Sequence, residues 1–101
     1  RGLLSTIYVD LNKGVNIKKL EKTLKSEYSK SRFVKILKLN SLVSTNSVIN
    51  TNNCSISICK TKYKNRVIIL SVIDNLIKGG AGQAIQNMNL KFNFPENKAL
   101  I

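Results

Sequence analysis

The chain has 101 residues, which is enough for one small domain with a single modest core. Seventeen basic and five acidic residues give a net charge of +12, and there is no histidine, which excludes Cys–His and Ser–His–Asp catalysis and removes the commonest metal ligand. No apolar run approaches the roughly 18 residues of a membrane span, so we expect no membrane partner. Because histidine is absent, we also expect no metal site.

The first forty residues predict a strand, a helix and a second strand. Apolar and polar residues alternate over residues 3–11, which is the period of a strand. Because this pattern begins directly after Arg1, without an initiator methionine, we expect that part of the fold precedes it. From Asn16, a candidate cap, the period becomes helical, with one apolar face made of Ile17, Leu20, Leu24 and Tyr28. Residues 33–39 predict the second strand.

Residues 40–53 form a polar segment rich in Asn, Ser and Thr. The segment is too long for an idle connection in a small domain, so one interpretation is a binding or subunit-contact loop. The other interpretation is a loosely ordered surface loop. The sequence leaves both open.

The last half of the chain predicts a hairpin followed by a helix. Residues 54–62 alternate again, a short turn follows, and residues 66–73 form the most apolar strand. A helix is expected at about residues 80–92, with an apolar stripe and a stop at Pro95; the stripe consists of Ala81, Ala84, Ile85 and Met88. The order β-α-β-β-β-α predicts an α+β fold, a mostly antiparallel or mixed sheet with helices packed on one face.

The side chains that could support catalysis are few and scattered. The five carboxylates show no paired acid/base spacing. Cys54 and Cys59 lie an odd number of residues apart on one predicted strand, so they point to opposite faces and neither pair with each other nor share a metal. We therefore expect both cysteines to be reduced thiols that serve in packing, and we expect no catalytic residue in this chain.

A glycine-rich turn between the last strand and the last helix is the best candidate for a binding site. Asp74 and Asn75 follow a buried strand, and Gly79 and Gly80 open the helix. A turn of this kind can bring bare backbone N–H groups and a helix N-terminus to a ligand. The glycines could equally serve only as a tight connection, and the residues alone do not decide.

The charge raises nucleic acid as a rival partner. Residues 1–70 hold fourteen basic and three acidic groups, whereas residues 71–101 hold three and two. Most of the basic residues are lysines spaced along helix or strand faces, with three Arg, three Tyr, three Phe and no Trp. Proteins that bind nucleic acid commonly contact phosphates and bases with arginine and stack bases on aromatic side chains. The composition therefore favours the interpretation that the basic residues form a solvated surface and bind no nucleic acid. A small basic nucleic-acid-binding module remains the alternative.

Residues 74–90, DNLIKGGAGQAIQNMNL, resemble the C-terminal signature of the N-acetyl-gamma-glutamyl-phosphate reductase family. The opening RGLLSTIYV is similar to a strand in the second half of that enzyme, and Asn52-Asn53-Cys54 stands where the family begins an asparagine-containing strand. The resemblance covers essentially the whole chain in the right order. Gly80 stands where the family more often has Ala or Ser, a small departure.

The resemblance implies an oxidoreductase of arginine biosynthesis in the semialdehyde dehydrogenase superfamily. Such an enzyme reduces N-acetylglutamyl phosphate to the semialdehyde with NADPH and releases phosphate, using a cysteine and a histidine that lie upstream of this segment. The chain would then be the C-terminal fragment of a cytoplasmic, homo-oligomeric enzyme, and the fragment would be inactive alone. A related lysine-pathway reductase of aminoadipyl phosphate shares much of the signature, and a remnant that only oligomerises is a third reading.

The resemblance also implies roles for particular residues. Residues 1–73 would be part of a glyceraldehyde-phosphate-dehydrogenase-like catalytic and dimerisation domain, and residues 74–101 would pack on a Rossmann domain. Asn75 would contact the nicotinamide carboxamide, and Gly79 and Gly80 would permit close approach to NADP. Arg1 would meet the phosphate or carboxylate of the substrate.

Overall fold

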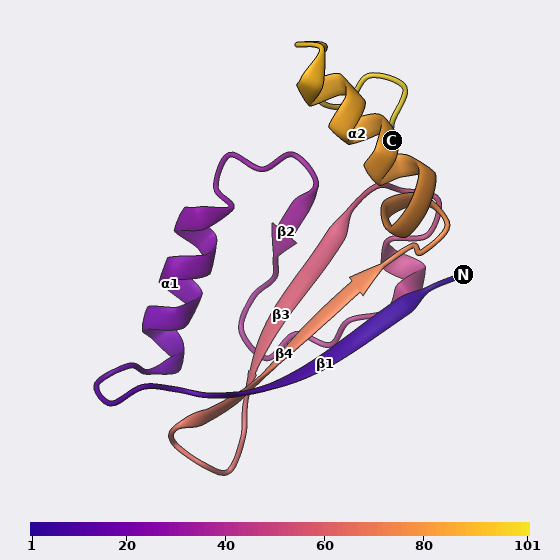
Figure 1. Ribbon diagram of the computed structural model, residues 1–101. Coiled ribbons are helices and arrows are strands. Elements are labelled where there is room, and N and C mark those ends of the chain that lie inside the picture. The colour runs from indigo at the N-terminus through magenta and orange to yellow at the C-terminus, as the bar shows by residue number, and fades with distance from the viewer.

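The structure, a computed structural model, describes all 101 residues as a four-stranded sheet with two α-helices and two short helical turns (Figure 1). In chain order the elements are β1 (Leu3–Asp10), α1 (Ile17–Glu27), β2 (Val34–Ile36), η1 (Thr45–Ser47), β3 (Cys54–Lys60), β4 (Arg66–Ile73), η2 (Ile77–Ala81) and α2 (Gly82–Lys91). This order confirms the predicted α+β class.

The sheet is mixed, in the strand order β1-β4-β3-β2. β4 pairs antiparallel with both β1 and β3, and β2 pairs parallel with β3. β2 is shorter than the predicted strand 33–39, although Leu37 N and Asn40 N still donate to β3; the chain turns at Asn40, which has a φ of +63°. Asparagine tolerates this left-handed conformation better than most residues.

The segment of residues 40–53 is the crossover that joins the parallel strands β2 and β3. It leaves β2, crosses one face of the sheet and returns to the start of β3, contacting both strands and the start of β1 on the way (Figure 1). Ser57 Oγ donates to Ser41 O at 2.7 Å, and Thr45 lies against Gly2. Val48 is fully buried. Parallel pairing requires a crossover of about this length, so the segment has a structural role that neither interpretation of the sequence included.

α1 lies on the β2–β3 side of the sheet, whereas α2 projects beyond the end of β4 (Figure 1). The Asn16 side chain caps α1 by accepting from Lys19 N at 2.9 Å, as expected. Gly80, within η2, has non-helical φ and ψ and kinks the chain just before α2. The radius of gyration is 14.9 Å, above the roughly 13 Å of a compact 100-residue domain, because α2 extends the molecule to 43 × 27 × 18 Å.

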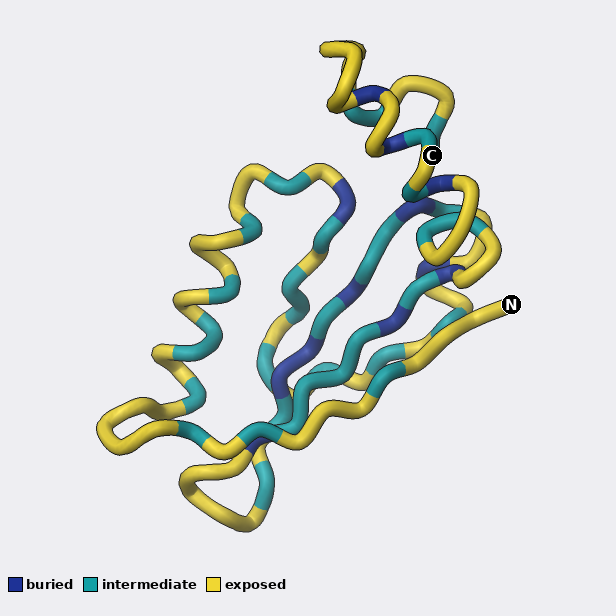
Figure 2. Tube along the Cα trace, in the orientation of Figure 1, coloured by how far each residue is buried: buried dark blue, intermediate teal, exposed yellow.

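The buried side of α2 is polar, contrary to the apolar stripe expected from the sequence. Its buried residues are Gly82, Gln86 and Asn89, whereas Met88 is 46% exposed (Figure 2). The reason is the tail after the helix, which folds back along it. Asn89 Nδ2 donates to the main-chain oxygens of Glu96 and Lys98 at 2.9 Å.

α2 ends at Lys91 with Phe92 as its C-cap, close to the expected end at about residue 92 and before Pro95. Asn93 has a φ of +59° and Phe94 N donates to Asn89 O at 2.8 Å, which is how a left-handed residue closes a helix.

The apolar core is small, and β1 is a poorly covered edge strand. The fully buried apolar side chains are Phe33, Val48, Ile58, Val67 and Val72. On one face of β1, Leu4 is 54% and Tyr8 69% exposed. No helix of the structure has the length and apolar character to cross a membrane.

Candidate functional site

The candidate site lies at the carboxyl end of β4, where Asp74 organises the turn into η2. The Asp74 carboxylate is 1% exposed and accepts from Asn50 N at 2.7 Å and from Leu76 N at 3.0 Å. The bond to a backbone N–H two residues ahead is the usual way in which aspartate closes a turn. Ile77 N and Gly79 N both donate to Asp74 O. Asp74 therefore fixes both the end of the strand and the start of the turn.

Asp74 is held in its ionised form. Burial alone would raise the pKa of this carboxyl, but the hydrogen bonds from Asn50, Leu76 and Arg1 outweigh burial and lower the pKa below its ordinary value of 3.8. The site thus contains a permanent negative charge at neutral pH, and the charge is matched by Arg1.

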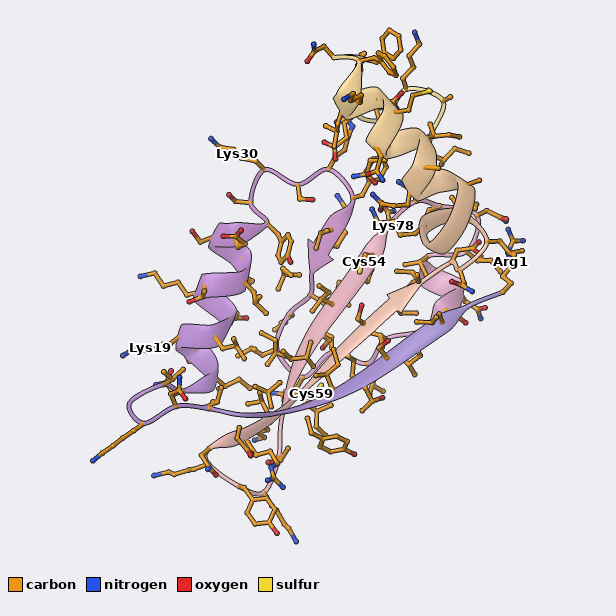
Figure 3. The ribbon with its side chains drawn as sticks, in the orientation of Figure 1. Arg1, Lys19, Lys30, Cys54, Cys59 and Lys78 are labelled. Carbon is orange, nitrogen blue, oxygen red and sulfur yellow. The ribbon has the colours of Figure 1, made fainter.

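Arg1 lies next to the turn, although 73 residues separate it from Asp74. Its Nε is 3.1 Å from Asp74 Oδ2 and 3.2 Å from Oδ1, and the side chain is 38% exposed (Figure 3). The pairing β1–β4, which aligns Leu3 with Ile73, brings these two ends together. Only Nε is engaged, so the two Nη groups keep their donors for another partner.

The two glycines predicted as binding residues have different surroundings. A Cβ on Gly79 would overlap Asn75 Oδ1 and lie 3.3 Å from Ile73 Cδ1. A Cβ on Gly80 would meet nothing closer than Asn75 O at 3.6 Å. Gly79 therefore permits the Asn75 side chain to lie across the turn, whereas Gly80 is a kink with room for a small side chain.

The structure thus brings all four predicted residues, Arg1, Asn75, Gly79 and Gly80, to one end of the sheet. Asn75 is exposed, with an amide that can both donate and accept, and the two glycines are exposed beside it. The Asn75 amide lies over Gly79 and can donate to and accept from a polar ligand, and Gly80 beside it carries no side chain. These groups contain no acid or base for proton transfer.

A buried polar cluster behind the turn was not predicted. Gln86 Oε1 accepts from Lys78 Nζ at 2.7 Å and from Asn52 Nδ2 at 2.9 Å, and Gln86 Nε2 donates to Glu96 Oε1 at 2.8 Å. Gly82 belongs to the same cluster, since a Cβ there would overlap Asn52 Oδ1 and lie 2.6 Å from Ile77 O. The high amide content of residues 83–89 was the only signal in the sequence.

Lys78 connects this cluster to the sheet. Its Nζ lies 5.5 Å from the centre of the Phe33 ring, near the start of β3 where Cys54 lies (Figure 3). Burial lowers the pKa of Lys78, and the nearby Cys54 and Glu96 oppose that shift.

Both cysteines are unpaired, as expected. Cys54 Sγ lies 3.4 Å from Ser71 Oγ, and Cys59 Sγ lies 3.8 Å from Ser41 O near the far end of β3 (Figure 3). No three side chains among Cys, Asp and Glu gather in a group that could hold a metal ion.

Comparison with known proteins gives consistent matches over the whole chain. The chain is 50% identical over 100 residues to the N-acetyl-gamma-glutamyl-phosphate reductase of Vesicomyosocius okutanii and 48% identical over 101 residues to that of Staphylococcus epidermidis. It is 42% identical to a probable chloroplastic N-acetyl-gamma-glutamyl-phosphate reductase of Arabidopsis thaliana.

These matches cover 99–100% of the chain but 28%, 29% and 25% of the three relatives, so the chain spans little more than a quarter of their length. Residues 1–75 match the family model described as semialdehyde dehydrogenase, dimerisation domain. That range contains the whole four-stranded sheet and ends at the turn where Arg1 meets Asp74. The chain therefore belongs to the semialdehyde dehydrogenase dimerisation-domain family.

Proposed function

We propose that the chain is the C-terminal part of an enzyme that reduces N-acetyl-L-glutamyl 5-phosphate to N-acetyl-L-glutamate 5-semialdehyde with NADPH and releases phosphate, a step of arginine biosynthesis. The observation that carries this proposal is the match, at 42–50% identity over essentially the whole chain, to proteins named N-acetyl-gamma-glutamyl-phosphate reductase. No helix spans a membrane, and we place the enzyme in the cytoplasm.

Within that enzyme, this chain would bind and orient the reactants. NADPH would supply the hydride, and the exposed amide of Asn75 would meet the nicotinamide carboxamide beside Gly79 and Gly80. The paired Arg1–Asp74 arrangement supports a role for Arg1 in binding the substrate's phosphate or carboxylate, because its Nη groups remain available. The nucleophile and the proton-transfer group would come from outside residues 1–101, so the chain alone would be inactive.

The two parts of the chain would meet different neighbours. Residues 1–73 would belong to the catalytic and dimerisation domain, and residues 74–101 would pack on a Rossmann domain. The outward apolar side of α2 and its tail supports the second contact: Leu90 is 55% and Phe92 63% exposed. Exposed apolar groups gathered on one projecting helix are typical of an interface.

The family's dimerisation-domain description and the exposed face of β1 support a homo-oligomer. Leu4 and Tyr8 lie on the same face of the edge strand, where a second copy could cover them. We infer that β1 contributes to the contact between copies.

The decisive test is Asn75→Ala in the full-length protein, with N-acetylglutamyl phosphate and NADPH as reactants. Removing the amide should raise the KM for NADPH by about tenfold, the value of roughly one hydrogen bond of about 1.5 kcal/mol. Asn12→Ala, at an exposed position between β1 and α1, is the matched control and should leave kcat and both KM values at those of the parent. Unchanged kinetics in Asn75→Ala would contradict the cofactor role of this residue.

The substrate is tested separately. The parental enzyme should reduce N-acetylglutamyl phosphate and leave a carrier-bound aminoadipyl phosphate unreacted. The opposite preference would assign the chain to the lysine-pathway reductase, and no reduction of either acyl phosphate would overturn the proposed function.

A further inference from the structure

The amide of Gln86 lies between a positive and a negative side chain. Lys78 Nζ can only donate and the Glu96 carboxylate can only accept, so Oε1 of Gln86 must face the lysine and Nε2 the carboxylate. Asn52 Nδ2 then bonds the same Oε1, which turns Asn52 Oδ1 towards the backbone of Gly82. The orientation of each group in the cluster is therefore set by its neighbours.

This cluster joins four segments of the chain. Lys78 belongs to η2, Gln86 to α2, Asn52 lies two residues before β3, and Glu96 lies in the tail. The Lys78 ammonium also lies over Phe33 at the start of β2 (Figure 3). Charge-assisted hydrogen bonds in a partly buried position are stronger than neutral ones.

Few other contacts hold α2 against the sheet. The helix projects past the end of β4 and its principal contacts are with η2, where Gly80 has non-helical φ and ψ and the bond from Gly82 N to Ile77 O spans the kink. The side chains of the cluster and the close contact between Gly82 and Asn52 therefore contribute to the direction of α2 and, together with the hydrogen bonds to Asp74, to the shape of the turn that carries Asn75.

We propose that Lys78 is a positioning residue which, through Gln86 and Glu96, holds the glycine turn in the shape that presents Asn75 to the cofactor. This inference rests on the proposed function for its ligand. It adds a residue that touches neither cofactor nor substrate and acts through the turn in which it lies.

The first test is hydrogen exchange of the full-length protein without ligand, comparing the parent with Lys78→Met. The amides of Leu76, Ile77 and Gly79, which bond to Asp74, should exchange at least tenfold faster in the variant, while β3 and β4 keep their protection. Lys30→Met, at an exposed lysine between α1 and β2, is the matched control and should leave the turn protected. Unchanged turn amides, or equal loss of protection throughout the sheet, would overturn the proposal.

A second test exchanges the amide and the carboxylate and does not depend on Lys78→Met folding. Gln86→Glu alone places two carboxylates where the structure has a 2.8 Å hydrogen bond, so turn exchange should rise. The double variant Gln86→Glu/Glu96→Gln restores a donor between the two positions and keeps the net charge, and parental exchange should return. If the turn amides of the double variant exchanged as fast as those of the single variant, the proposed link between Gln86, Glu96 and the turn would be contradicted.

Kinetics separate this inference from the proposed function. In an active reductase, Lys78→Met should raise the KM for NADPH by about tenfold while the KM for the acyl phosphate stays unchanged. Equal losses for both reactants would indicate general destabilisation and overturn the positioning role. If the parent lacks reductase activity, the proposed function fails, and the exchange experiments still decide whether Lys78 holds the turn.

Discussion

The choice of residue at several positions after β4 is constrained by close contacts more than by hydrophobicity. Gly82 is buried against Asn52 and Ile77, and its Cα occupies a position where any side chain would overlap them. A Cβ on Gly80, two residues earlier, would make only ordinary van der Waals contact with Asn75 O. The two glycines differ in what surrounds them, so substituting each by alanine separates close packing from turn geometry.

Gly82→Ala should lower the free energy of unfolding by about 1–3 kcal/mol, because the new methyl group must displace Asn52 or the Ile77 carbonyl. Gly80→Ala, the matched control, should change it by less than about 1 kcal/mol, since a Cβ there lies 3.6 Å from its nearest neighbour. Urea unfolding of the two variants measures the difference. Equal destabilisation would contradict the close contact at Gly82.

Asp74 should make stability depend on pH in the acid range. Its pKa is lowered in the folded state, so its contribution is fully present above its ordinary value of 3.8 and is lost as the pH falls through the lower folded value. The Tm of the parent should therefore fall more steeply below about pH 4 than that of Asp74→Asn, which should already be lower at neutral pH. Parallel Tm profiles between pH 2 and 6 would contradict this role; Glu27→Gln serves as the surface control.

At the scale of the elements, the sequence predicts the strands better than the last helix. The alternation in residues 3–11 and the apolar run 66–73 correspond to β1 and β4, because these strands have strong local patterns. The facing of α2 depends on residues outside it: Asn52, Glu96 and the main chain of Lys98 bond to its buried amides, and of the atoms of those amides only Asn89 Oδ1 has no hydrogen-bond partner. No periodicity within the helix contains that information.

The candidate site shows the same division. Arg1, Asn75, Gly79 and Gly80 could be predicted from a strand-to-turn signature and a family resemblance, and the structure places them together. The sequence alone does not distinguish Lys78, Gln86 and Gly82 from neighbouring residues as parts of the site, because each contributes through contacts with residues outside its own segment. The role of residues 40–53 also required the sheet order, since only a parallel pair β2–β3 needs a crossover.

The exposed face of β1 should control self-association. Leu4→Gln/Tyr8→Gln removes two apolar side chains from this face without changing the net charge, so a contact between copies should weaken by about tenfold or more. Leu42→Gln, on the crossover at 91% exposure, should leave self-association unchanged. Light scattering across a range of protein concentrations measures the self-association of both variants. Unchanged self-association of the double variant would exclude this face of β1 from the contact between copies.

At the scale of the whole molecule, the excess of basic residues should have little effect on function. Replacing Lys18, Lys22 and Lys25 of α1 by glutamine should leave kcat and both KM values of the reductase unchanged, because α1 lies on the β2–β3 side, away from the turn. Any binding to single- or double-stranded DNA should be weak and fall steeply with salt, as for a non-specific polycation.

Fluorescence anisotropy with labelled oligonucleotides at 50 and 200 mM salt provides the measurement. Sequence-dependent binding that survives the higher salt and disappears in the triple variant would favour the nucleic-acid-binding alternative. The parent protein with Lys91→Gln, which changes one charge on α2, is the control for charge alone.

The polar inner side of α2 has a consequence for the order of folding. Apolar burial contributes about 25 cal/mol per Å² from the first stages of collapse, whereas a hydrogen bond contributes a net ~1 kcal/mol and only when its geometry is complete. The sheet, with Val67, Val72 and Ile58 in its core, can therefore form while α2 is still detached. We expect the surface that presents Asn75 to be the last part of the chain to become ordered, after the rest of the domain has acquired its native shape.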